Sequence, residues 1–186
     1  MSEAELTSKR VRFGEENRTG LLAGVNILSN AVRTTLGPKG RTVIIQVPLK
    51  QPVVTKDGVT VAQEVMLDDP LENMGAQMVL EAARRTNVDA GDGTTTATVL
   101  AHSMYTEGLK MIAAGMSATE ICRGIDFAAR RVEEELRSMS LDVSSDEDVV
   151  HVGTISANGD SNIGNLLCKA VRAVGPSGTV TVEDAK

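Results

Sequence analysis

The chain has 186 residues, of which 41% are apolar and 24% are charged, and its formal net charge is −6. This composition is typical of a globular protein of one or two domains, and it excludes the disordered and fibrous classes. Nucleic-acid binding depends on basic side chains and stacking aromatic rings, whereas this acidic chain has two Phe, one Tyr and no Trp. We therefore expect no nucleic-acid partner.

The first predicted elements are a helix and two short strands. Apolar residues recur at steps of three and four from Leu21 to Leu36, on one face of a helix that Gly37-Pro38 ends. The β-branched runs Thr42–Val47 and Val53–Thr55 predict two short strands joined by an irregular connection. The residues Lys56–Gly58 then predict a turn.

Three longer helices are predicted next. The first begins at Asp69-Pro70 and ends at Asp89–Gly93, the second runs from Thr94 to about Ala114, and the third ends at Met139. The charged side of the third helix indicates a solvated face. The apolar positions are Leu71, Met74, Met78 and Ala82 in the first helix, Ala97, Leu100, Ala101, Met104 and Met111 facing inward in the second, and Ile121, Ile125, Ala128, Val132, Leu136 and Met139 in the third.

A polar, acidic stretch at Ser140–Asp148 predicts a boundary between two packing units. Two shorter helices are expected beyond it, at Val149–Ile155 and Ile163–Val174, with a turn at Asn158–Asp160 between them. Alternation at Thr179–Glu183 predicts a strand. The predicted fold class is mainly α with a few short β strands.

Neither the cysteines nor the start of the chain indicates a secreted or membrane protein. Cys122 and Cys168 have no metal-ligand spacing and are predicted to be small buried side chains. The first fourteen residues mix acids and bases, unlike a secretory signal, and no apolar run is long enough to span a membrane. We expect a protein of the reducing cytoplasm without a membrane partner.

Three segments combine residue types that suit phosphate recognition. In the 90–98 loop, Gly91 and Gly93 let the backbone approach a ligand, and three threonines open a helix whose free N–H groups attract anions. Asp92 is placed to bind the Mg²⁺ that accompanies a nucleotide. An ordinary glycine-rich helix cap explains this loop equally well.

The other two segments are the 34–40 turn and the 55–58 turn. The first contains two glycines, a proline and Lys39, and the second sets Lys56 beside Asp57, although each composition is also common in ordinary turns. The chain has neither a P-loop nor a GxGxxG motif, so a small kinase or transferase is a weak alternative. His102 and His151 lack catalytic companions and are predicted to be structural.

Taken together, the motifs resemble those of the GroEL-type group I chaperonin subunit, in the same order and over nearly the whole chain from about Lys9. The segments that carry the resemblance are Gly24–Leu28 with Thr35–Arg41, Thr55–Val59, Glu72–Met78, Ala90–Thr98, Arg123–Asp126 and Val152–Asn158.

The resemblance implies a subunit of a double ring with seven members in each ring, which encloses non-native proteins and cycles by binding and hydrolysing ATP. It implies that residues 1–139 are the first segment of the equatorial, ATP-binding domain and that residues 140–186 begin the intermediate hinge domain. The apical domain, which binds unfolded proteins and the GroES-type co-chaperonin, and the second equatorial segment lie outside this sequence.

The resemblance also implies roles for individual residues. Asp57 is expected near the attacking water, Asp92 on Mg²⁺, and the backbone oxygens of Thr35 and Lys56 near a K⁺ ion. The residues expected to contact ATP are Thr35, Leu36, Gly37, Pro38, Lys56, Asp92, Gly93, Thr94, Thr95, Thr96, Ile155 and Ser156.

Two departures from the family pattern affect these expectations. The segment Val47–Pro52 replaces the family's glycine-containing hairpin, which puts the usual contact between subunits in doubt. The family's catalytic aspartate and adenine-binding residues fall beyond Lys186, so we expect this chain alone not to hydrolyse ATP at a chaperonin rate. An alternative role is a truncated, non-hydrolysing interaction module that joins or interferes with complete chaperonin rings.

Overall fold

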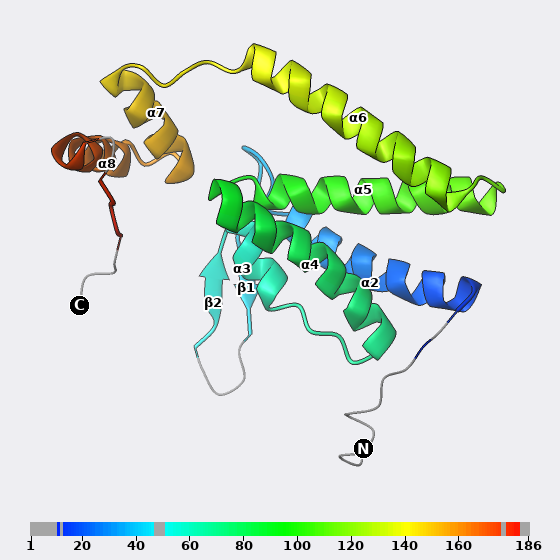
Figure 1. Cartoon of the computed structure of the whole chain (residues 1–186). Coiled ribbons are helices and arrows are strands. Elements are labelled where there is room, and N and C mark those ends of the chain that lie inside the picture. The colour runs from blue at the N-terminus through cyan, green and yellow to red at the C-terminus, as the bar shows by residue number, and fades with distance from the viewer. Residues whose placement is uncertain (1–10, 12, 47–50, 176–177, 183–186) are drawn as a thin grey trace. The chain divides into compact units, whose positions relative to one another are not determined.

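The computed structural model describes residues 11, 13–46, 51–175 and 178–182. Contacts divide the chain into two compact units, residues 1–127 and 128–186, so the division falls inside one helix. Most of the described residues are helical (Figure 1). The elements are α2 (Glu15–Arg33), β1 (Val43–Ile45), β2 (Val53–Thr55), α3 (Gly58–Gln63), α4 (Pro70–Ala90), α5 (Thr94–Ala113), α6 (Ala118–Met139), α7 (Asp146–Ser156) and α8 (Ser161–Val174).

In the first unit, α2 crosses α4 at backbone contact. A Cβ atom on Gly24 would lie 1.7 Å from the carbonyl oxygen of Glu72, and one on Gly75 would lie 2.1 Å from that of Leu21. Because a side chain at either glycine would overlap the opposite backbone, only glycine permits this separation of the helices. The sequence pattern of these helices did not indicate the contact.

The core of the first unit lies between α2, α3 and α4, and its members are apolar side chains of moderate size. α5 covers this core with Ala101 and Tyr105, which are partly buried. Thr98 is fully buried, and its hydroxyl donates a hydrogen bond of 2.9 Å to the carbonyl oxygen of Thr94. The core residues are Val25, Leu28, Val32, Val61, Ala62, Ala76, Val79 and Leu80.

The inward face of α5 differs from the prediction. Ala101 is partly buried, but Leu100, Met104 and Met111 are exposed, and the buried positions are Thr94 and Thr98. In α4, likewise, Met74 and Met78 are exposed while Leu71, Gly75, Ala76, Val79, Leu80 and Ala83 are buried. Both helices carry apolar residues on more than one face, so periodicity alone could not identify the face that packs.

The two predicted strands form an antiparallel pair in which Ile44 lies opposite Val54. Both side chains are exposed, at 71% and 64% of their surface. Most of the irregular connection at Val47–Pro52 lies outside the described residues. The helix α3 directly follows the 55–58 turn and was not predicted, because six residues are too few for a clear helical period.

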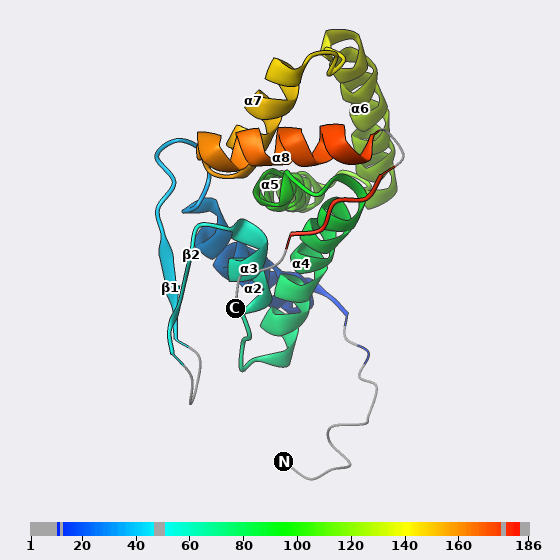
Figure 2. The same ribbon diagram turned by 90° about the vertical axis from the view of Figure 1, so that its left-hand side faces the viewer.

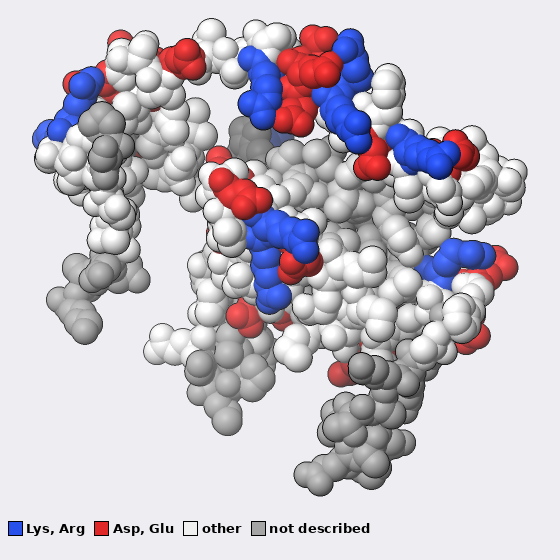
Figure 3. Space-filling view, in the orientation of Figure 1, with Lys and Arg blue, Asp and Glu red and all other residues white. Residues whose placement is uncertain are grey.

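The amphipathic helix α6 has no buried residue, although its predicted bounds are nearly correct. Its charged side carries local ion pairs, including Arg131 with Glu134 at 2.6 Å and Arg137 with Glu133 at 2.7 Å. Figure 3 shows basic and acidic side chains alternating along this helix. Such exposed pairs add little stability. Cys122 lies on this helix and is exposed, so the prediction that it is buried was wrong.

The second unit pairs α7 with α8, close to the predicted helices. The Ser145 side chain and Asp148 form a capping box at the start of α7, and Asp160 caps α8. Cys168 is buried in this pair, as predicted. The described residues 178–182 form no strand, because a strand requires a hydrogen-bonded partner and none is present in the part of the chain that is described.

No helix within the described ranges is both long and apolar enough to cross a lipid bilayer.

Candidate functional site

The 34–40 turn follows directly from the end of α2. The hydroxyl of Thr35 donates a hydrogen bond of 2.8 Å to the carbonyl oxygen of Val32, and the N–H of Arg41 donates one of 2.8 Å to the carbonyl oxygen of Thr34. Gly37 has φ +74°, in the left-handed region that favours glycine. The chain therefore folds back on itself immediately beyond the helix, and the turn has a defined shape.

The 55–58 turn holds Asp57 as the N-cap of α3. One carboxylate oxygen of Asp57 accepts hydrogen bonds from the N–H of Thr60 at 3.0 Å and from its hydroxyl at 2.6 Å. The N–H of Asp57 donates in turn to the Thr55 hydroxyl at 3.0 Å. The spacing of Asp57 and Thr60 was the available sequence signal for this cap. Lys56 and Asp57 are both exposed to solvent.

The 90–98 loop joins two long helices through two glycines in the left-handed region. Gly91 ends α4 with φ +72°, and Gly93 precedes α5 with φ +83°. Oδ1 of Asp92 accepts a hydrogen bond of 2.7 Å from the N–H of Gly93. No side chain caps α5, so the N–H groups of its first turn have no such partner. These groups and the positive end of the helix dipole favour an anion there.

These three segments meet at one end of the first unit. A Cβ atom on Gly58 would lie 2.0 Å from Oγ1 of Thr95 and 3.1 Å from Cγ1 of Val32. The 55–58 turn is thus packed directly against the start of α5 and the last turn of α2. Figures 1 and 2 show the ends of α2 and α4 and the start of α5 on the same side of the helices.

Within the first unit, the structure brings together the residues that the sequence analysis selected there. The residues at this end of the first unit are Thr35, Leu36, Gly37, Pro38, Lys56, Asp57, Asp92, Gly93, Thr94, Thr95 and Thr96. Ile155 and Ser156, also selected from the sequence, lie at the end of α7 in the second unit. Sequence reasoning did not select Gly58 as a contact of Thr95, because only the fold brings these two residues together.

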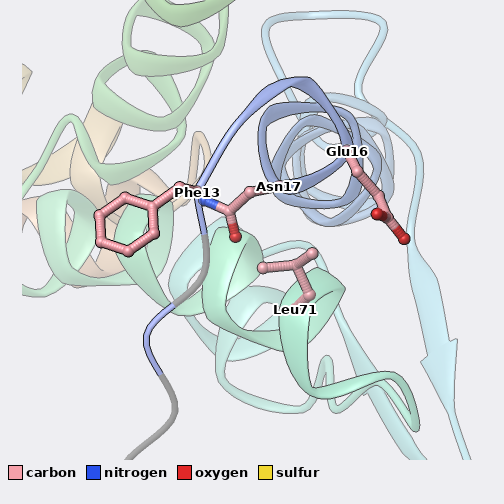
Figure 4. Close-up of a pocket in the computed structure, with 4 residues that line it drawn as sticks. All are labelled: Phe13, Glu16, Asn17 and Leu71. Carbon is pink, nitrogen blue, oxygen red and sulfur yellow. The ribbon is translucent and has the colours of Figure 1, made fainter.

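The hollows described in the first unit lie at the other end of α2. One of about 410 Å³ is lined by Phe13, Glu16, Asn17 and Leu71 (Figure 4). A second, of about 430 Å³, is lined by Glu15, Arg18, Thr19, Leu22, Leu109, Ile112 and Ala113. None of the residues selected as phosphate contacts lines either hollow, so neither is part of the candidate site.

Comparisons with known proteins support a family assignment. The sequence profile of the TCP-1/cpn60 chaperonin family matches residues 28–185. A group III chaperonin, solved in the open state, is 29% identical, with a TM-score of 0.71 over 85% of this chain and 32% of that chain.

A second solved structure is the chaperonin gp146 from the bacteriophage EL 2 (Pseudomonas aeruginosa) in the presence of ATP-BeFx. It is 28% identical, with a TM-score of 0.71 over 84% of this chain and 28% of that chain. The present chain therefore spans about a third of the length of these solved chaperonins. Since the family profile covers most of its residues, the chain belongs to the TCP-1/cpn60 chaperonin family.

Proposed function

We propose that this chain is the ATP-binding amino-terminal portion of a chaperonin subunit of the GroEL type. The observation that carries the proposal is the contact of Gly58, in the 55–58 turn, with Thr95 at the start of α5 and with Val32, in the last turn of α2 just before the 34–40 turn. The bacteriophage relative was solved in the presence of ATP-BeFx, which supports a nucleotide as the ligand.

The triphosphate would be bound mainly by the backbone. The N–H groups at Gly93–Thr96 supply donors at the start of α5, and the hydroxyls of Thr94, Thr95 and Thr96 add to them. Lys56 contributes the positive charge, while Thr35, Leu36, Gly37 and Pro38 line the nucleotide from the end of α2. Ile155 and Ser156 are further candidate contacts of ATP, on the family resemblance.

Asp92 fits the role of a magnesium ligand. One of its oxygens accepts the hydrogen bond from Gly93, which leaves the other for a cation. The described ranges contain no group of three acidic, His or Cys side chains that could hold a metal. A Mg²⁺ ion would accordingly arrive with the nucleotide, whose phosphate oxygens and waters supply its other ligands. Backbone oxygens of Thr35 and Lys56 are our candidates for a K⁺ site.

Asp57 would orient the water that attacks the terminal phosphate. Its hydrogen bonds to Thr60 hold the carboxylate at the start of α3, so the group is fixed before any ligand binds. This cap ties the position of Asp57 to the fold of α3.

In the full subunit we propose ATP-dependent folding of non-native proteins in the cytoplasm. The subunit would assemble into a double ring with seven members in each ring and act with a GroES-type co-chaperonin. Residues 1–139 would belong to the equatorial domain and residues 140–186 to the intermediate domain.

The test is thermal unfolding of the purified chain with Mg-ATP, with ATP plus a chelator, and with neither. We expect Mg-ATP to raise the melting temperature, because a ligand that binds only the folded state stabilises it. Asp92→Ala should abolish the magnesium-dependent part of the shift. Asp142→Ala removes another exposed carboxylate, in the second unit, and should keep the full shift. A wild-type melt that does not respond to Mg-ATP would contradict the proposal.

A further inference from the structure

Gly58 is the first residue of α3 and is buried between α2 and α5. The space that a side chain would need is already filled, because an added Cβ would lie 2.0 Å from Oγ1 and 3.2 Å from Cβ of Thr95. It would also lie 3.1 Å from Cγ1 of Val32. Real Cβ atoms essentially never approach another heavy atom as closely as the first of these distances.

The backbone conformation of Gly58 does not itself require glycine. The glycines with positive φ are Gly14, Gly37, Gly91, Gly93, Gly115, Gly159 and Gly175, and Gly58 is not among them. Alanine could therefore adopt the same φ and ψ, and its cost would come from contacts: mainly the overlap with Thr95, with a smaller part from the close approach to Val32. A substitution at position 58 therefore tests the effect of side-chain contacts without backbone strain.

We propose that Gly58 is a positioning residue of the nucleotide site, which acts by setting the side chain of Thr95. This inference rests on the proposed function, since it gives Thr95 a phosphate to contact. Side chains occupy staggered rotamers, so a methyl group at position 58 forces the Thr95 hydroxyl out of its present well. The hydroxyl then points in another direction and loses the position from which it would contact the phosphates at the start of α5.

The same contact relates two parts of the site. Asp57 precedes Gly58 and is fixed by its hydrogen bonds to the N–H and hydroxyl of Thr60. Because α3 meets α5 through Gly58 without an intervening side chain, the Asp57 carboxylate is held at one distance from the start of α5. Water positioning and phosphate binding therefore depend on a single close contact.

The experiment is a double-mutant cycle with Gly58→Ala, Thr95→Ala and the combined variant. The affinity for Mg-ATP is measured by calorimetric titration at a temperature at which each variant is folded, and unfolding is followed separately without ligand. We expect each single variant to lose affinity on the order of tenfold. The combined variant should bind no more weakly than Thr95→Ala and should melt above Gly58→Ala, because the overlapping hydroxyl is gone.

Gly124→Ala is the matched control, since nothing lies within 4 Å of a Cβ added there. It should bind Mg-ATP as the wild type does. Losses of affinity that multiply in the combined variant would overturn the inference, as would a Gly58→Ala protein that melts lower but binds normally when folded. If Gly58→Ala does not fold, folding of the combined variant becomes the test. A combined variant that also fails to fold would show that the Thr95 hydroxyl is not what obstructs the added methyl group, and would overturn the inference. A wild-type chain that ignores Mg-ATP would overturn the proposed function and this inference together.

Discussion

The Nε2 atom of His102 on α5 lies 2.8 Å from the Oδ1 atom of Asn26 on α2, although the two residues are 76 positions apart. The contact is partly buried and joins two helices of the first unit. The amide oxygen can only accept, so the imidazole donates from Nε2. This polar contact accompanies the apolar packing of α5 on α2.

Replacing Asn26 by leucine should lower the free energy of unfolding by about 1–2 kcal/mol, because the imidazole N–H loses its acceptor. Adding His102→Leu should recover part of that loss, since no polar group is then left unpaired. Urea unfolding of the single and double variants measures both effects. Ser103→Ala, on an exposed neighbour in α5, is the control and should change stability little. Strictly additive losses from Asn26 and His102 would contradict the pairing.

Gly24→Ala should be among the most damaging single substitutions in the chain. Its methyl group would lie 1.7 Å from the Glu72 carbonyl oxygen, so α2 and α4 would have to separate. We expect a loss of about 3 kcal/mol or more, or failure to fold, in denaturant unfolding. Gly124→Ala meets no atom within 4 Å and should be neutral or stabilise α6 by about 0.5–1 kcal/mol. Equal effects of the two substitutions would refute the backbone contact.

Tyr105 should titrate at unusually high pH. Burial raises the pKa of Tyr105 above its ordinary value of 10.0, and Arg18 lowers it by a smaller amount. The folded state thus retains the phenolic proton after the unfolded state has lost it, so stability falls as the pH rises from about 10.

Because the chain has one Tyr and no Trp, the ultraviolet absorbance of the phenolate reports this residue alone. Arg18→Ala should move the midpoint further upward, and Tyr105→Phe should remove the corresponding loss of stability. A midpoint below that of a free tyrosine peptide would be inconsistent with the burial.

The start of α7 should be sensitive to acid. The Ser145 side chain, and then the N–H groups of Ser145 and Ser144, lower the pKa of Asp148 by hydrogen bonding. A lowered pKa stabilises the folded state above the unfolded pKa, and this stabilisation disappears as the pH falls through the folded pKa, below about 4.

Asp148→Asn should therefore lower the melting temperature at neutral pH and have little effect once the wild-type carboxylate is protonated. Melting curves across this range test the prediction. Asp142→Asn, which changes an exposed carboxylate just before α7, should not affect the melt in either range. A constant difference between Asp148→Asn and the wild type at every pH would argue against the carboxylate as the cause.

The sequence predicted the long helices well where their ends carry specific chemistry. Asp69 caps α4 and Pro70 occupies its first turn, while Gly91 ends it in the left-handed region. These are local properties of a few residues, so they can be read without the fold. The packed faces could not be read in this way, since burial of Thr98 in place of Leu100 is decided by the neighbouring helices.

The candidate site was predictable in composition but not in geometry. The residue types at Asp57 and Asp92 indicated turns suited to phosphate and metal. Their proximity depends on the contact of Gly58 with Thr95 and on the crossing at Gly24, which join segments far apart in the sequence. An exposed Cys122 was equally unpredictable, because α6 has the sequence of a packed helix and no buried residue among those described.

The close crossing of α2 and α4 lies far from the two helix ends that lead into the candidate site. From Gly24, α2 continues for about 14 Å to Arg33, and from Gly75, α4 continues for about 22 Å to Ala90, at 1.5 Å per residue. The end of α2 leads into the 34–40 turn and the end of α4 leads into the 90–98 loop, at the same side of the helices (Figure 1). A small change in the angle between α2 and α4 at their crossing therefore produces a larger displacement at both helix ends. The distance between Thr35 and Asp92 thus depends on Gly24 and Gly75, which are remote from either residue.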